Sequence, residues 1–210
     1  MDFEFGLYPV VSVEFCSGRS PFYVLEQILE GGAKIVQLRN KVDHKKDIYE
    51  QAVIFRTITA KYNARLIIND HLDIALATDA DGVHLGQEDL PCFAARALAP
   101  DLIIGVSTHN LAELKKAETD GATYVNIGPI FQTNTKTTAT PPLGLEYLKT
   151  AKTSLPFSVM GGIKKDNIES LLQLGVKNIA MVTEITMAED ISGKTSELIN
   201  EINRWNSLNL

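Results

Sequence analysis

The segment from residue 37 to residue 41 places an amide and two cations at every second position. Gln37, Arg39 and Lys41 share one parity, so in an extended strand their side chains point the same way, while Leu38 points to the opposite side. Guanidinium, ammonium and amide groups at one strand end suit a phosphate or pyrophosphate ligand. The alternative is a solvated strand end in which the cations pair with Asp43.

Two carboxylates could bind a metal ion. Asp70 and Asp89 each follow a short apolar run, and the ends of neighbouring parallel strands lie about 5 Å apart. Mg²⁺ commonly takes one or two carboxylates and completes its shell with phosphate oxygens and water. Helix capping is the alternative role, because Asp70 precedes a short helical stretch and Asp89 stands just before Leu90 and Pro91.

A second group of residues could bind another anion. Gly161 and Gly162 follow an apolar run and precede a helical stretch. Backbone amides at such a turn form a phosphate cup in many barrels, although any tight turn can need glycine. Thr133, Thr135 and Lys136 stand in an irregular, threonine-rich stretch and could either contact an anion or merely decorate the loop. Two separate anion sites indicate two phosphorylated substrates.

Short apolar runs alternate with amphipathic helical stretches along the whole chain. The predicted strands cover 7–13, 34–38, 65–68, 82–85, 102–106, 124–127, 157–160 and 178–182. The predicted helices cover 21–30, 45–62, 72–78, 91–99, 112–119, 143–152, 167–174 and 195–204. Several predicted strands are apolar on both faces, as buried parallel strands are.

About eight βα units predict one α/β domain over residues 1–210, a TIM (β/α)8 barrel. An open doubly wound sheet is the alternative, but no G-x-G-x-x-G pattern follows the first predicted strand. In a TIM barrel the active site forms at the carboxyl ends of the strands. The candidate residues follow predicted strands, so the barrel would place them together on one rim.

The composition excludes several other classes of protein. Hydrophobic residues make up 45% and charged residues 22%, as in an ordinary globular domain and unlike a disordered chain. The net charge of −6 argues against general binding of nucleic acid or membrane surfaces. Cys16 and Cys92 are the only cysteines, which excludes a disulfide scaffold and a cysteine-rich zinc site. The first residues lack a signal-peptide pattern, so we expect a cytoplasmic protein.

Seven segments resemble the thiamine-phosphate synthase family. They are VQLRNK (36–41), IIND (67–70), DGVHLGQEDLP (81–91), GVSTHN (105–110), IGPIFQTNTK (127–136), GGI (161–163) and AMVTEI (180–185). The segments occur in the family's order and cover nearly the whole chain. Proteins of this family join a pyrimidine diphosphate to a thiazole phosphate and release pyrophosphate.

The resemblance implies a role for each candidate residue. The pyrimidine diphosphate would be bound by Gln37, Arg39, Lys41, Asn69, Ser107 and Lys136, together with Leu38 and Asn40 of the same segment. The thiazole phosphate would be bound by Thr133, Asn134, Thr135, Gly162, Val182 and Thr183. Asp70 and Asp89 would hold Mg²⁺ on the pyrophosphate. The implied reaction is dissociative and needs no protein nucleophile, so Arg39, Lys41 and Lys136 would act by stabilising the leaving group.

Some positions depart from the family's usual pattern, and two other activities compete with synthesis. The departures are Ser12 for an acidic residue, Asn40 for Glu, Gln132 for Pro, Thr183 for Ser, and Met160. A thiazole tautomerase on the same barrel would not need the cationic clamp, and a non-catalytic sensor of phosphorylated ligands would be expected to lose part of it. The expected partners are phosphorylated small molecules and not nucleic acid or membrane, and the sequence is compatible with a homo-oligomer.

Overall fold

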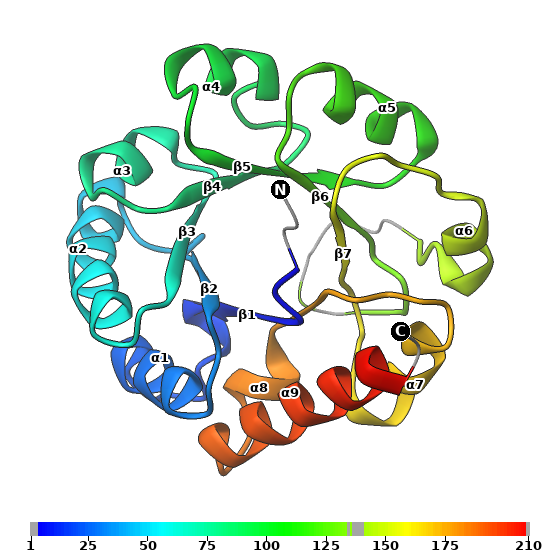
Figure 1. Cartoon of the computed structure of the whole chain (residues 1–210). Coiled ribbons are helices and arrows are strands. Elements are labelled where there is room, and N and C mark those ends of the chain that lie inside the picture. Colours follow the sequence, from blue (N-terminus) through cyan, green and yellow to red (C-terminus); the bar gives the residue numbers. More distant parts are fainter. Residues whose placement is uncertain (1–3, 134, 136–140, 209–210) are drawn as a thin grey trace.

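Eight parallel strands close into a barrel in the order in which they occur in the chain (Figure 1). The computed structural model describes residues 4–133, 135 and 141–208. The strands are β1 (Leu7–Ser12), β2 (Ile35–Arg39), β3 (Arg65–Asn69), β4 (Gly82–Leu85), β5 (Ile103–Thr108), β6 (Tyr124–Ile127), β7 (Phe157–Val159) and β8 (Ile179–Met181). The predicted TIM barrel is confirmed, and the open doubly wound sheet is excluded.

Helices surround the barrel (Figure 1). They are α1 (Pro21–Glu30), α2 (Lys45–Lys61), α3 (Leu72–Ala77), α4 (Cys92–Leu98), α5 (Leu111–Thr119), α6 (Gly144–Thr150), α7 (Lys165–Leu172), α8 (Thr183–Thr186) and α9 (Ile191–Leu208), with a 3-10 helix η1 (Val13–Phe15) after β1. The apolar pattern predicts neither η1 nor α8, and α9 begins earlier than predicted. Within the described part of the chain, no helix is both long and apolar enough to cross a membrane.

Alternate residues of each strand face two different layers. Leu38 belongs to the large apolar layer between the strands and the helices. Ile35 belongs to a smaller cluster inside the barrel, together with Tyr8, Ile67, Tyr124 and Ala180. Along β2 the inward positions run from Ile35 through the amide of Gln37 to the guanidinium of Arg39. The interior therefore changes from apolar to polar and charged toward the carboxyl ends of the strands.

The strand register brings the polar strand ends together on one rim. Ser12 pairs with Arg39 between β1 and β2, and Asn69 pairs with His84 between β3 and β4. Because all eight strands are parallel, their carboxyl ends meet at the same end of the barrel. Side chains from distant parts of the sequence thus face one space.

The first and last strands close the ring. β1 pairs with β8 through a register that joins Leu7 to Ile179 and Pro9 to Met181. Just before β8, the Asn178 Oδ1 atom accepts hydrogen bonds from the backbone N–H groups of Phe5 and Gly6, at 2.8 and 3.0 Å. The side chain of Asn178 therefore fixes the chain just before β1 to the chain just before β8.

Candidate active site at the carboxyl ends of the strands

A cavity of about 880 Å³ is lined by residues at the carboxyl ends of the strands and by the loops that follow them. It collects many of the residues that the sequence predicts for the site: Gln37, Arg39, Asn69, Ser107, Thr133, Thr135, Gly162, Val182 and Thr183. A concave space of this size with several convergent polar groups is typical of a small-molecule site. The structure therefore brings most of the two predicted groups of anion-binding residues into one cavity, whereas Lys41, Asp70 and Asp89 do not line it and Asp89 lines a second, smaller pocket.

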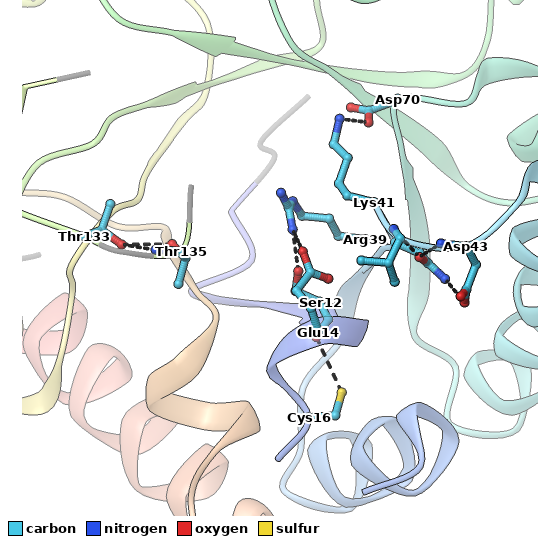
Figure 2. Close-up of polar contacts among 11 residues, drawn as sticks. Ser12, Glu14, Cys16, Arg39, Lys41, Asp43, Asp70, Thr133 and Thr135 are labelled. Carbon is cyan, nitrogen blue, oxygen red and sulfur yellow. Dashed lines mark hydrogen bonds and ion pairs between the residues drawn. The ribbon is translucent and has the colours of Figure 1, made fainter. Parts of the chain in front are cut away.

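Arg39 is held at the cavity wall by two acceptors from the end of β1 and from η1 (Figure 2). Its Nη1 atom donates to Ser12 Oγ at 2.6 Å and to Glu14 Oε1 at 2.5 Å. These bonds orient a planar guanidinium whose N–H groups match two oxygens of a phosphate. Glu14 has no place in the sequence prediction, because only the fold of η1 brings it to Arg39.

Asn40 and Leu38 lie in the same segment, but their side chains do not line the cavity. Leu38 is buried against the helical layer. Asn40 organises the loop after β2, since its Nδ2 donates to Asp43 Oδ2 at 2.7 Å and to Gln51 Oε1 at 3.0 Å. The hydrogen bonds that Asp43 accepts from Asn40 and, at 2.9 Å, from Gln51 Nε2 lower the pKa of Asp43. Contacts from Leu38 and Asn40 to a substrate stay a prediction and would have to use their main chain.

Arg39 at the end of β2 and Lys41 in the loop after it do not pair with Asp43, contrary to the alternative drawn from the sequence. Arg39 pairs with Glu14, and the Lys41 ammonium forms a close ion pair with Asp70 Oδ2 (Figure 2). Lys41 therefore stands beside the carboxylate predicted to bind a metal ion.

Asp70 and Asp89 lie beside each other and neither caps a helix. The residues that precede α3 and α4 are His71 and Pro91, and neither makes a side-chain cap bond. Asp89 Oδ2 instead accepts the Gly86 backbone N–H at 2.7 Å. Asp70 takes up a left-handed backbone conformation, with φ of 64°. The two carboxylates are thus held by their own loops at the ends of β3 and β4.

The electrostatics of this pair fit a divalent cation. Burial, and then the adjacent Asp89 carboxylate, raise the pKa of Asp70. Burial also acts to raise the pKa of Asp89, but hydrogen bonds from Asp70 and the Gly86 N–H outweigh it and lower that pKa. Two carboxyl groups that compete for one proton can both ionise when a cation lies between them. Since the described residues bring no third metal-ligating side chain to this place, phosphate oxygens and water would complete the shell of Mg²⁺.

The opposite wall of the cavity is formed by the loops after β6, β7 and β8. Thr133 Oγ1 and Thr135 Oγ1 are hydrogen-bonded at 2.8 Å, and Figure 2 shows them on the other side of Arg39 from the Lys41–Asp70 pair. Gly162 has a φ of +61°, and a Cβ atom there would collide with the Gln132 carbonyl oxygen. Only glycine lets these two loops approach so closely.

Of the other residues predicted for this wall, two lie at the start of α8 and two lie outside the described residues. Thr183 is the first residue of α8, and Val182 precedes it. A short extra helix after the last strands is a common part of phosphate sites in TIM barrels. Asn134 and Lys136 lie outside the described residues.

A chain of hydrogen bonds runs beneath the cavity inside the barrel. Gln37 Nε2 donates to the Tyr8 hydroxyl at 2.8 Å, and the Tyr8 and Tyr124 hydroxyls lie 2.9 Å apart. His84 joins the Tyr124 hydroxyl through Nδ1 at 3.0 Å and Ser107 Oγ through Nε2 at 2.9 Å. His84 is thus a hydrogen-bonded residue of β4 that also lines the cavity.

Comparison with known proteins decides the family. Residues 7–185 match the family model described as thiamine monophosphate synthase. The chain belongs to this family. Thiamine-phosphate synthases from Halalkalibacterium halodurans and Caldicellulosiruptor saccharolyticus are 44% and 43% identical to it, over 95% and 93% of this chain and 95% and 90% of theirs. The chain is accordingly a transferase.

A solved structure supports the same assignment. The chain superimposes on the thiamine phosphate pyrophosphorylase from Pyrococcus furiosus with a TM-score of 0.87 and 35% identity, over 96% of both chains. A 3-hexulose-6-phosphate synthase from Salmonella typhimurium shares the fold alone, with a TM-score of 0.70 and 17% identity over 95% of this chain and 99% of that one. The barrel is therefore common to other enzymes, and it is the sequence match that places the chain in the thiamine monophosphate synthase family.

Three of the departures from the family's sequence pattern lie at or beside the cavity. The first strand ends at Ser12, whose hydroxyl still accepts from Arg39, and Glu14 supplies a carboxylate two residues later. Gln132 and Met160 both line the cavity. Neither of these two departures replaces one of the predicted cations or carboxylates.

Proposed function

We propose that the chain joins hydroxymethylpyrimidine diphosphate to hydroxyethylthiazole phosphate, which yields thiamine phosphate and pyrophosphate. The observation that carries the proposal is one cavity with two unlike ends. Arg39 stands at one end, with the Lys41–Asp70 ion pair beyond it, and Thr133 and the loop of Gly162 stand at the other end. This arrangement suits a diphosphate and a monophosphate held side by side.

The proposed reaction is dissociative. The bond between the pyrimidine methylene carbon and the diphosphate oxygen breaks, and its electron pair leaves with pyrophosphate. The thiazole ring nitrogen then donates its lone pair to the resulting pyrimidine-methyl cation and forms the new C–N bond. No protein atom is bonded to the substrate at any stage, so the protein acts by positioning two substrates and by stabilising charge.

The protein's own residues would stabilise the leaving group. Arg39 is pre-oriented by Ser12 and Glu14, so its guanidinium need not reorganise as negative charge develops on the leaving oxygens. Lys41 and Lys136 would add further positive charge to the pyrophosphate. Mg²⁺ held by Asp70 and Asp89 would supply Lewis-acid neutralisation of the same group.

The second substrate would be positioned by the opposite wall. Hydroxyl groups of Thr133, Thr135 and Thr183, and the backbone N–H groups near Gly162, offer donors for a phosphate. A phosphate fixed there would direct the thiazole ring toward the middle of the cavity, where the methylene carbon would lie.

The test is a product assay with the purified full chain. We would mix it with both substrates in the presence of Mg²⁺ or of EDTA, and measure thiamine phosphate through its fluorescent oxidation product. Product that depends on Mg²⁺ is the expected result. A folded protein that binds the diphosphate but forms no product would refute the proposal and favour the tautomerase or the sensor.

A further inference from the structure

A hydrogen-bonded chain inside the barrel connects the cavity residues Gln37 and Ser107 through Tyr8, Tyr124 and His84, of which only His84 lines the cavity. Gln37 and Ser107 line it, while Tyr8 and Tyr124 are fully buried beneath it. The chain runs from Gln37 through Tyr8, Tyr124 and His84 to Ser107, with heavy-atom distances of 2.8, 2.9, 3.0 and 2.9 Å. Each distance is that of a normal hydrogen bond.

Counting hydrogens gives one direction in which every bond of this hydrogen-bond chain has a donor and an acceptor. The Gln37 amide N–H donates to Tyr8, so the single hydroxyl hydrogen of Tyr8 is available for Tyr124. In the arrangement that uses each hydroxyl hydrogen for one bond of this series, Tyr8 donates to Tyr124 and Tyr124 donates to His84 Nδ1. An imidazole that accepts at Nδ1 is neutral and carries its hydrogen at Nε2. His84 therefore donates to Ser107 Oγ, and the Ser107 hydroxyl hydrogen is directed to the cavity.

We propose that Tyr8, Tyr124 and His84 are positioning residues. Tyr8 and Tyr124 hold His84 as the Nε2–H tautomer, and His84 in turn makes Ser107 a hydrogen-bond donor to the ligand. The ligand atom that meets Ser107 must then be an acceptor, as an anionic oxygen of the leaving diphosphate is. This last step rests on the proposed function, whereas the tautomer of His84 does not.

The surroundings of the chain support a fixed arrangement. Burial raises the pKa of both Tyr8 and Tyr124, so each hydroxyl keeps its one hydrogen. A Cβ atom at position 105 would collide with the Tyr124 ring and with His84 Nδ1, so Gly105 leaves the space in which these two side chains meet. Connected hydrogen bonds in a buried environment polarise one another. The hydrogen bond that Gln37 donates to Tyr8 can therefore strengthen the hydrogen bond that Ser107 donates to a ligand.

NMR of ¹⁵N-histidine-labelled full-length protein without ligand tests the tautomer directly. Loss of one ring signal in His84→Gln identifies the resonances of His84. The expected result is a hydrogen on Nε2 and none on Nδ1. A hydrogen on Nδ1 in the wild-type protein would overturn the proposal.

Reversing the first donor tests whether Gln37 sets the direction. A carboxylate only accepts hydrogen bonds, so Gln37→Glu is expected to turn the Tyr8 and Tyr124 hydroxyls around and move the His84 hydrogen to Nδ1. In a Tyr8→Phe background the same substitution is expected to leave the tautomer unchanged. Retention of the Nε2–H tautomer in the folded Gln37→Glu protein would show that the group at position 37 does not set the direction of the hydrogen bonds that lead to His84.

A matched control is Ser158→Ala. Ser158 in β7 is also fully buried, and its hydroxyl has no hydrogen-bond partner among the residues that the structure describes. The tautomer of His84 is expected to stay unchanged in this variant. A change would mean that the ¹⁵N signal of His84 responds to packing in general and not to the series of hydrogen bonds from Gln37.

Kinetics test the consequence for turnover. Tyr8→Phe removes one hydroxyl that does not line the cavity, and we expect kcat to fall about threefold to tenfold while KM changes by less than about twofold. An unchanged kcat would refute the positioning role. The two proposals fail separately: a wild-type protein that makes no thiamine phosphate refutes the function, whereas an active enzyme with His84 protonated at Nδ1 refutes only the inference.

Discussion

Replacing Asp89 by asparagine is expected to change stability and activity in opposite directions. Asp89 Oδ2 accepts the Gly86 backbone N–H at 2.7 Å, and the asparagine carbonyl oxygen can keep this bond. The substitution removes one charge from a pair in which burial, and then Asp89, raise the pKa of Asp70. Two like charges at about 4 Å repel by about 1 kcal/mol in water and about 4 kcal/mol near a protein surface. Because Asp89 is partly exposed, we expect the metal-free variant to be at least as stable as wild type, by up to about 1 kcal/mol.

The same substitution should nearly abolish turnover if the carboxylate holds Mg²⁺. Metal stabilisation of transition-state charge amounts to several kcal/mol, and each 1.36 kcal/mol is a factor of ten in rate. Loss of about 3–4 kcal/mol corresponds to a decrease of about 10²- to 10³-fold in kcat. Raising the Mg²⁺ concentration should recover part of the loss, because Asp70 remains.

Urea unfolding in EDTA and thiamine phosphate formation measured against Mg²⁺ concentration check the two effects. Asp73→Asn is the matched control, since Asp73 pairs with Lys45 on the exposed surface of α3, and we expect its activity to equal that of wild type. Near-normal turnover of Asp89→Asn would remove Asp89 from the metal site. A loss of more than about 1 kcal/mol of metal-free stability would show that the carboxylate has a structural role instead.

Three further predictions concern other parts of the chain. Lys136→Ala should lower both kcat and kcat/KM in steady-state kinetics, by about 10²- to 10³-fold, and a change confined to KM would mean that Lys136 only binds substrate. Gly162→Ala should lower the free energy of unfolding by about 1–3 kcal/mol in urea titrations, because φ is +61° and the new Cβ would meet the Gln132 carbonyl; unchanged stability would contradict this. Hydrogen bonds, first that from Thr153, lower the pKa of Glu118 from 4.5 to about 2. Its contribution to stability is therefore complete above about pH 4.5 and lost as the pH falls toward 2, and urea unfolding of Glu118→Gln should lack this component.

The fold follows closely from the sequence because local patterns determine its elements. Runs that are apolar on both faces predict the parallel strands, and amphipathic stretches predict most helices. The four-residue helix α8 is too short to show a helical period, and the 3-10 helix η1 is shorter still. Both follow a strand at the rim, where packing against the loops, and not propensity, decides the conformation.

The site was predictable to the extent that it depends on position along a strand. The rule that barrel sites form at strand carboxyl ends is enough to gather Arg39, Ser107 and Thr183 into one cavity. Contacts that depend on register between distant segments could not be predicted. The Tyr8 and Tyr124 hydroxyls meet although 116 positions separate them in the sequence, and Glu14 reaches Arg39 only because β1 and β2 pair as they do.

The pairing of β1 with β8 has a consequence for synthesis of the chain. β1 is made first, and the strand that covers its outer edge, residues 179–181, is made near the end. Until then, a nascent chain carries an uncovered strand edge on each side of the incomplete sheet, and such edges pair readily with other chains. Ribosome stalling before residue 179 would therefore leave an aggregation-prone intermediate, whereas release of the full chain lets the two edges cover each other in a single closing step.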